Sequence, residues 1–286
     1  MTSDATGGPG GEFPDALLSL RDLRVSYPGK GRAPRARTLK GVSLDIRPGE
    51  TLGLVGESGS GKTTIGRAVI GLAPVESGTI TFAGSRIERA GRARRRALAR
   101  DLQVVFQDPY TSLNPSRTVG DTLGEPLLGQ GTRTKEARAR IAELLERVRL
   151  PADAADRLPR EFSGGQRQRV AIARALALRP RLVICDEPVS ALDLTTQRTV
   201  LELLLEIQEE TRVAYLFVTH DLGVVRFMSH RVAVIQAGEL VETGDAVQVT
   251  SEPRHPYTRA LMLAAPVADV REQRRRREAA GLSARS

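Results

Sequence analysis

Residues 56–63 read Gly-Glu-Ser-Gly-Ser-Gly-Lys-Thr and match the phosphate-loop spacing GxxxxGK(S/T). The loop follows an apolar segment ending at Val55 and precedes a segment that favours a helix from about Lys62. Its glycines let the backbone curl until successive amide hydrogens point at phosphate oxygens, and the helix start adds free amides and a positive dipole end. We expect Lys62 to reach the β- and γ-phosphates and the Thr63 hydroxyl to ligate Mg²⁺. The stretch therefore predicts a site for a nucleoside triphosphate.

Strand patterns on both sides of the loop predict an α/β domain. Short alternating runs at residues 23–27, 42–46, 50–55 and 79–82 are separated by turn signals at 28–30, 47–50 and 76–78. A further strand is expected at 102–106 and an inserted helical subdomain at about 109–160. In that insert, apolar residues recur at steps of three and four and share one helix face: Ala137, Ile141, Leu144, Leu145 and Val148. The α/β pattern returns with helices at about 165–178 and 194–210, strands at 182–185 and 214–218, and a hairpin over 231–242.

The two ends of the chain differ in composition from its middle. Residues 1–16 are small, polar and rich in Gly and Pro, so we expect a disordered leader there, without the features of a secretory signal. We place one nucleotide-binding domain at 17–250 and a C-terminal extension with a basic tail at 251–286. No run reaches the roughly 18 apolar residues of a membrane helix, so the chain is not expected to form a pore alone.

Composition limits the classes of partner. The net charge is +9, but aromatic residues make up 3% of the chain, which leaves little material for stacking bases. A broad use of arginine along the chain, or attraction to an anionic membrane surface, explains the positive charge as well as DNA does, and we expect no specific nucleic-acid partner. The single cysteine, Cys185, excludes an internal disulfide and fits a reducing compartment. Because it lies in an apolar run, we expect a small buried side chain.

Polar side chains follow several predicted strands at the point where each strand ends. Asp186 and Glu187 come directly after the strand at 182–185, whereas Gln107 and His220 follow two other strands. Because the carboxyl ends of parallel strands share one edge, where ligands bind, we expect these groups near the phosphate loop. Asp186 is then placed to hold Mg²⁺ through water, and Glu187 to accept a proton from the attacking water. Gln107 and His220 are expected to serve the same chemistry, although a lone histidine is more often structural.

A second anion-binding helix start is predicted at Ser163. This residue is a good N-cap, and Gly164 and Gly165 leave the first amides of the helix exposed. One chain already has a phosphate loop, so a second such feature about a hundred residues later makes most sense if it serves a nucleotide on another subunit.

The sequence of this helix start carries a family resemblance. Residues 162–166, Phe-Ser-Gly-Gly-Gln, resemble the signature of ABC transporter ATPases, which usually reads Leu-Ser-Gly-Gly-Gln, and the motifs of that family occur in order over about residues 17–265. The resemblance implies an α/β fold: a P-loop NTPase of ABC type with an N-terminal antiparallel β subdomain and an inserted helical subdomain. A GTPase or kinase with the same phosphate loop would leave Ser163 to Gln166 unexplained.

The resemblance also implies roles for individual residues. Tyr27 is expected to stack on adenine, although it could be an ordinary strand aromatic, and Gln107 is expected to face the membrane partner and contact Mg²⁺. The resemblance further implies that residues 190–193 form the loop that crosses to the second subunit and that His220 is the switch histidine near the γ-phosphate. The expected ATP contacts are Gly56, Glu57, Ser58, Gly59, Ser60, Gly61, Lys62, Thr63, Thr64, Ser163, Gly164, Gly165, Gln166 and Asp193.

Two further segments resemble the oligopeptide/dipeptide importer ATPases. They are residues 107–115 and residues 252–261, which include a His-Pro-Tyr-Thr box. The resemblance implies an ATP-hydrolysing subunit at the cytoplasmic face of the cell membrane. Its expected partners are two multi-span permeases, a second ATPase that is a copy or a relative, and, indirectly, an extracytoplasmic solute-binding protein. The alternative is a soluble ABC-type ATPase of an enzyme or nucleic-acid complex, such as a phosphonate-cleavage subunit.

Overall fold

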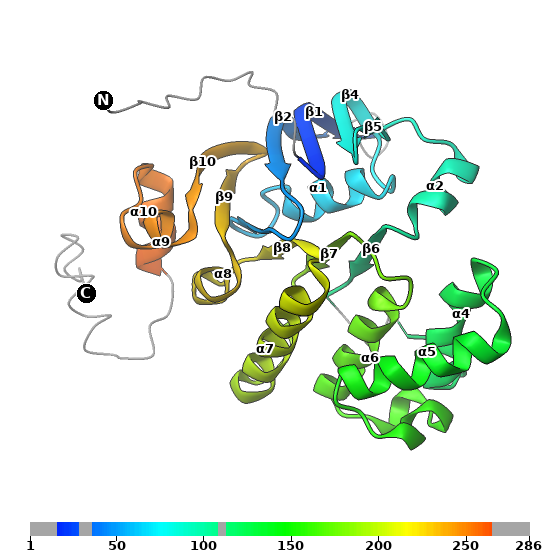
Figure 1. Ribbon diagram of the computed structural model, residues 1–286. Coiled ribbons are helices and arrows are strands. Elements are labelled where there is room, and N and C mark those ends of the chain that lie inside the picture. The colour runs from blue at the N-terminus through cyan, green and yellow to red at the C-terminus, as the bar shows by residue number, and fades with distance from the viewer. Residues whose placement is uncertain (1–15, 29–35, 108–112, 265–286) are drawn as a thin grey trace, which may run out of the picture.

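A six-stranded sheet, whose parallel strands carry the apolar runs of the sequence, forms the centre of the fold (Figure 1). The computed structural model describes residues 16–28, 36–107 and 113–264, so most of the predicted leader and the basic tail lie outside the described residues. The strand order is β10-β9-β3-β8-β7-β6; β10 is antiparallel to β9, and the other neighbours are parallel. The strands are β3 (Thr51–Val55), β6 (Leu102–Val105), β7 (Leu182–Asp186), β8 (Ala214–Thr219), β9 (Arg231–Gln236) and β10 (Glu239–Asp245).

Both faces of this sheet are buried, and alternate residues of each strand face opposite sides. In β7, Leu182 and Ile184 belong to the core on one face, whereas Val183 and Cys185 belong to the core on the other. This is the alternation that the pleat of a strand imposes. Cys185 is fully buried, as expected, and its burial raises the pKa of its thiol far above the ordinary value.

A four-stranded antiparallel sheet covers one side, and helix α1 (Lys62–Val69) lies between it and the central sheet (Figure 1). Its strands are β1 (Leu18–Tyr27), β2 (Ala36–Ile46), β4 (Val75–Phe82) and β5 (Ser85–Arg86). The turn expected at 76–78 is wrong, because these residues lie within β4. Gly78 has φ of 92°, and a Cβ on it would lie 2.4 Å from the carbonyl oxygen of Asp22. The glycine therefore serves an irregular register between β1 and β4 rather than a chain reversal.

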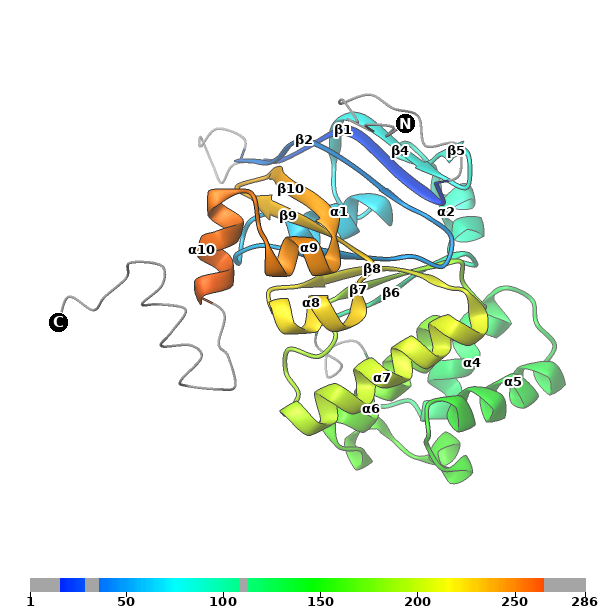
Figure 2. The ribbon, with the colours of Figure 1, turned by 60° about the vertical axis from the view of Figure 1, so that its left-hand side comes forward.

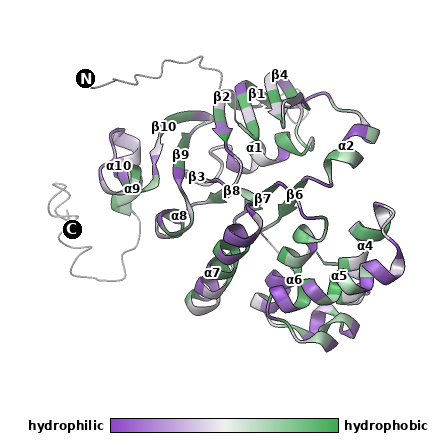
Figure 3. Ribbon diagram, viewed as in Figure 1, coloured by the Kyte–Doolittle hydropathy of each residue, from purple (hydrophilic) through white to green (hydrophobic). Residues whose placement is uncertain are grey.

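Helices cover the other face of the central sheet. They are α6 (Gly164–Leu176), α7 (Leu194–Thr211) and α8 (Leu222–Met228), with α4 (Val119–Gly129), α5 (Thr134–Arg147) and the 3-10 turns η1 (Ala152–Asp156) and η2 (Pro159–Glu161) beyond them. In Figure 3, α6 and α7 alternate hydrophobic and hydrophilic segments, as helices with one buried face do. The apolar face predicted for α5 is confirmed, since Ala137, Leu144 and Leu145 are buried there.

Three short helices complete the described fold. Helix α2 (Arg92–Leu98) lies between β5 and β6, while α9 (Ala246–Ser251) and α10 (Pro256–Ala264) lie beside β9 and β10 (Figure 2). The hairpin predicted over 231–242 is confirmed, with Ala237 and Gly238 at positive φ in its turn. Among the helices formed by the described residues, none has the length and apolar character needed to cross a membrane.

Candidate nucleotide site

The phosphate loop connects the carboxyl end of β3 to α1, and a close backbone contact or a positive φ requires glycine at two of its positions. A Cβ on Gly56 would lie 2.1 Å from the carbonyl oxygen of Ile235, and Gly61 has φ of 111° at the start of α1. A side chain at Gly56 would force the backbone to move, and a side chain at Gly61 would be strained at that φ. Gly59, in contrast, has open space where its Cβ would lie. The loop is therefore packed against β9 at its start and open at its middle, where a phosphate could approach.

Lys62 folds back over the loop. Its Nζ donates to the carbonyl oxygens of Gly56 and Glu57, at 2.6 and 2.7 Å, and the residue is 5% exposed. An ammonium has three N–H donors, so the two bonds leave capacity for a phosphate oxygen. Burial lowers the pKa of Lys62, and the carboxylates of Glu187 and Asp186 oppose that shift. The ammonium is held where it would meet an anion entering the loop.

Thr63 and Asp186 meet across the edge of the sheet. The Thr63 hydroxyl donates to Asp186 Oδ1 at 3.0 Å, joining the start of α1 to the end of β7. Burial raises the pKa of Asp186, whereas the hydrogen bond from Thr63 acts in the opposite direction. A hydroxyl and a carboxylate are the hard oxygen ligands that Mg²⁺ prefers, so this pair fits the metal that the sequence predicts. Gln107 follows the neighbouring strand β6 and is exposed.

Glu187 and His220 form a second pair on the same edge. His220 Nδ1 lies 3.3 Å from Glu187 Oε1, a contact that is an ion pair only when the imidazole is protonated. Glu187 has φ of 49°, and its N–H donates to the carbonyl oxygen of Val218 at 2.9 Å. The Ser190 hydroxyl donates to the carbonyl oxygen of Glu187 at 3.1 Å. The strained backbone is thus held on both sides, which is typical of a functional position.

The predicted second anion site is built as a capped helix start. Ser163 Oγ accepts from the Gln166 N–H at 3.3 Å, and Gln166 Oε1 accepts from the Ser163 N–H at 2.9 Å, so the two residues form a capping box at the start of α6. A Cβ on Gly165 would lie 2.1 Å from Thr196 Cγ2. Asp193 caps α7 through Thr196, whose N–H and hydroxyl it accepts at 3.0 and 2.7 Å. The signature segment therefore lies against Thr196 of α7, and Thr196 is hydrogen-bonded to Asp193 at the end of the 190–193 loop.

For the remaining predicted site residues the structure gives the burial but no contact that indicates a role. Tyr27 ends β1 and is partly buried against the core cluster that contains β1 and α1. Ser58 is exposed, Ser60 and Thr64 are buried, and Gly164 is half-buried. Their roles toward a nucleotide stay predictions.

Sequence reasoning missed Tyr257 as a neighbour of the loop. Its hydroxyl accepts the N–H of Glu57 at 3.0 Å, although the two residues are 200 positions apart. The available signal is the His-Pro-Tyr-Thr box, which in the sequence indicates only a resemblance to a subfamily.

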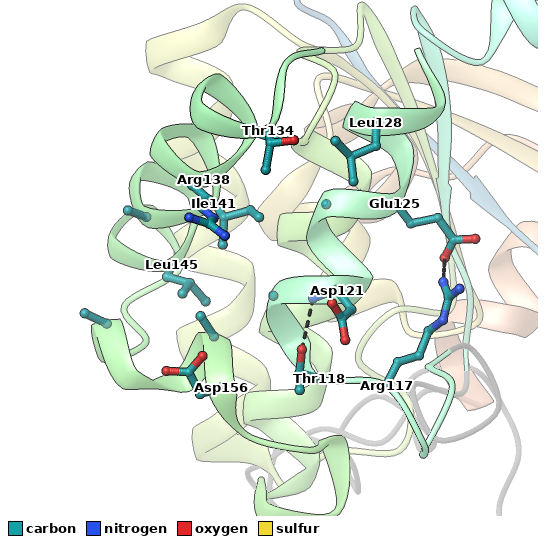
Figure 4. A pocket seen from close by; sticks show the side chains of 16 residues that line it. Arg117, Thr118, Asp121, Glu125, Leu128, Thr134, Arg138, Ile141, Leu145 and Asp156 are labelled. Atoms are coloured by element: carbon teal, nitrogen blue, oxygen red, sulfur yellow. Dashed lines mark hydrogen bonds and ion pairs between the residues drawn. The ribbon is translucent and has the colours of Figure 1, made fainter. Parts of the chain in front are cut away.

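A groove of about 930 Å³ opens between α4, α5 and η1 (Figure 4). Leu128, Ile141 and Leu145 give it an apolar lining, and a pair of charged residues borders it on the α4 side, with Arg117 Nη1 2.8 Å from Glu125 Oε2. Further charged residues at its surface are Asp121, Arg138 and Asp156. An apolar floor with charged margins is typical of a surface that receives an amphipathic helix.

Comparisons with known proteins agree with this site. The family model described as ABC transporter matches residues 39–190, and the model described as oligopeptide/dipeptide transporter, C-terminal region, matches residues 241–285. The glutathione import ATP-binding protein GsiA of Escherichia coli (strain K12) is 48% identical over 92% of this chain, but the match spans only 43% of that relative. A Brucella abortus protein named as a peptide import ATP-binding protein is 51% identical over 86% of this chain and 75% of its own.

A solved structure shows the same architecture. It is a dimeric ATP-binding cassette in a post-hydrolysis state, bound to ADP and Pi, and it matches with a TM-score of 0.73 at 31% identity, over 80% of this chain and 99% of that one. The extent of the family match, the similarity to the relatives and the shared architecture lead to one assignment: this chain belongs to the ABC transporter family.

Proposed function

We propose that this chain binds and hydrolyses ATP and thereby powers an importer of peptides or similar small solutes. The observation that carries the proposal is the meeting of two polar pairs beside the phosphate loop. Thr63 lies 3.0 Å from Asp186, and Glu187 lies 3.3 Å from His220, all at the carboxyl edge of the parallel strands. That edge is where open α/β sheets bind ligands.

The mechanism assigns one task to each group. The loop amides and Lys62 bind the phosphates, Thr63 and Asp186 would hold Mg²⁺ together with Gln107, and Glu187 accepts the proton of the attacking water. When bound, Mg²⁺ neutralises charge that develops on the phosphate oxygens. His220 contacts the Glu187 carboxylate and orients it, and the imidazole would also contact the γ-phosphate of bound ATP.

Hydrolysis further requires a second cassette. We infer that two chains close head to tail, so that each ATP lies between the loop of one chain and Ser163 with Gly165 of the other. The dimeric cassette with ADP and Pi supports this arrangement. The positive dipole end of α6, with its capped first turn, supplies amides for the opposing nucleotide. The partner is a copy of this chain or a relative.

The cargo and membrane partners are proposed from the relatives and from one surface. The oligopeptide/dipeptide C-terminal region and the peptide and glutathione import relatives support a peptide-like solute. We assign the groove lined by Leu128, Ile141 and Leu145 to an amphipathic helix of a multi-span permease, because its apolar floor and charged margins suit that shape (Figure 4). The chain would then lie at the cytoplasmic membrane face, and a solute-binding protein would act on the far side.

Purification from gently solubilised native membranes, with an assay of MgATP hydrolysis on the same sample, tests this function. We expect two multi-span permeases to copurify, and hydrolysis to be lost in a matched Lys62→Ala preparation. Recovery of soluble enzymes or nucleic acid without a membrane protein would keep the ATPase chemistry and overturn the transport assignment. A parent preparation without hydrolysis would overturn both.

A further inference from the structure

The C-terminal extension packs directly behind the phosphate loop. Tyr257, Leu261 and Met262 of α10 lie against a hydrophobic cluster whose members come from β3, α8, β9 and α9: Val55, Leu222, Val225, Val232, Val234, Ala246 and Val249. Val55 is the residue immediately before the loop begins. Figure 2 shows α10 beside α9 and the β9–β10 hairpin. The helix therefore packs on the same hydrophobic cluster as Val55, the last residue of the strand that leads into the loop.

A single peptide group of the loop is held from both edges. The N–H of Glu57 donates to Tyr257 Oη at 3.0 Å, and the carbonyl oxygen of Gly56 accepts from Lys62 Nζ at 2.6 Å. These two atoms belong to the same peptide plane, in which N–H and C=O point in opposite directions. Each bond polarises the amide in the sense that favours the other. A rotation of this peptide would break both bonds at once.

We propose that Tyr257 is a positioning residue that fixes the Gly56–Glu57 peptide and thereby the nucleotide-ready shape of the phosphate loop. The inference rests on the proposed function in that the loop is taken to bind ATP. The hydroxyl accepts only the Glu57 N–H, so it leaves the other amides of the loop to bind phosphate. The same hydrogen bond from Glu57 keeps the Gly56 carbonyl directed at Lys62. That carbonyl fixes the position of the Lys62 ammonium before phosphate binds.

Hydrogen bonds hold the His-Pro-Tyr-Thr box in place and so fix the position of the Tyr257 hydroxyl. Glu242 of β10 accepts the N–H groups of Arg254 and His255, at 2.9 and 3.0 Å. His255 Nδ1 in turn accepts the N–H of Tyr257 at 3.2 Å, at the start of α10. The two aromatic residues of the box thus have distinct tasks. His255 holds the first turn of α10 together with the carboxylate of Glu242, and Tyr257 reaches the loop.

The same hairpin holds the loop at a second point. The N–H of Gly238, in the β9–β10 turn, donates to the carbonyl oxygen of Ser60 at 2.9 Å, and the Gly238 carbonyl oxygen accepts from the Lys40 N–H at 3.0 Å. The loop is therefore held at Glu57 by α10 and at Ser60 by the hairpin. Both supports come from the C-terminal part of the chain.

The test compares Tyr257→Phe with the parent, using the intact chain of 286 residues. The variant keeps the aromatic packing and removes only the hydroxyl. In the nucleotide-free protein we expect faster hydrogen exchange at the Glu57 amide. With a fluorescent ATP analogue and Mg²⁺, we expect a Kd raised roughly two- to tenfold, as for loss of one hydrogen bond. The melting temperature should stay close to that of the parent.

The matched control is Tyr215→Phe. Tyr215 donates from its hydroxyl to the carbonyl oxygen of Leu204 at 3.1 Å, inside the core and away from the loop. This variant should lower the melting temperature while leaving Glu57 exchange and nucleotide affinity unchanged. Parent-like exchange and affinity in Tyr257→Phe would overturn the inference. A parent chain that fails to bind the nucleotide would instead overturn the proposed function, and the exchange in the nucleotide-free state would still decide whether the contact holds the loop.

Discussion

Replacement of Glu187 by glutamine is the sharpest test of the assigned chemistry. The side chain is 16% exposed, and the substitution conserves its volume, so the change is one of charge and basicity rather than of packing. Loss of a general base lowers hydrolysis by about 10²- to 10⁴-fold, or roughly 3–5 kcal/mol of transition-state stabilisation. ATP binding should not weaken, because the variant also removes a negative charge from the neighbourhood of Asp186 and of the incoming triphosphate.

Single-turnover hydrolysis, nucleotide affinity and sedimentation of the complex measure these effects separately. We expect Glu187→Gln to bind MgATP at least as tightly as the parent and to accumulate as a closed dimer. Glu206→Gln is the matched control, since Glu206 is an exposed carboxylate of α7 paired with Arg149 at 2.6 Å. That control should hydrolyse ATP at the parent rate. If Glu187→Gln also did so, Glu187 would not be the base and the reasoning from the strand end would be wrong.

Three further variants probe parts of the site. Ser163→Ala removes the oxygen that caps α6, so urea unfolding should show a loss of about 1 kcal/mol, whereas a parent-like midpoint would argue against the capping box. Gly56→Ala places a Cβ 2.1 Å from the Ile235 carbonyl oxygen, and calorimetry should show a loss of about 1–3 kcal/mol with impaired nucleotide binding. Burial alone would raise the pKa of Glu242, but hydrogen bonds from the extension outweigh burial and lower this pKa from its ordinary value of 4.5. The ionised carboxylate therefore stabilises the fold at neutral pH, and this stabilisation is lost as the pH falls through the lowered pKa. The melting-temperature gap between the parent and Glu242→Gln should therefore be large at neutral pH and narrow on acidification; a constant gap would contradict the assignment.

Much of the site could be anticipated because parallel strands share a direction. Once Val55 and Cys185 are recognised as the ends of parallel strands, the residues that follow them must emerge at one edge. The structure accordingly places Thr63 beside Asp186 and Glu187 beside His220. The helices and the hairpin turn could also be predicted from the sequence, because they depend on contacts between residues close in sequence.

Contacts that depend on the register between two strands could not be predicted from the sequence. Residues 76–78 carry turn-forming residues, yet they run through β4, because the pairing with β1 demands an irregularity where a glycine can approach a backbone carbonyl. A glycine at positive φ serves a turn or a bulge equally well. The distinction lies in the partner strand, which local composition does not reveal.

The link between Tyr257 and the loop shows what connects such distant segments. Strand β9 pairs in parallel with β3, so the strand that leads into the C-terminal extension runs beside the strand that leads into the phosphate loop. The hairpin then turns the chain back along β9, and α10 is brought to the cluster that contains Val55. A tyrosine on that helix can reach Glu57 because strand order, not sequence distance, sets the separation. In the sequence the C-terminal extension indicates only a resemblance to a subfamily. In the fold its tyrosine is hydrogen-bonded to the phosphate loop.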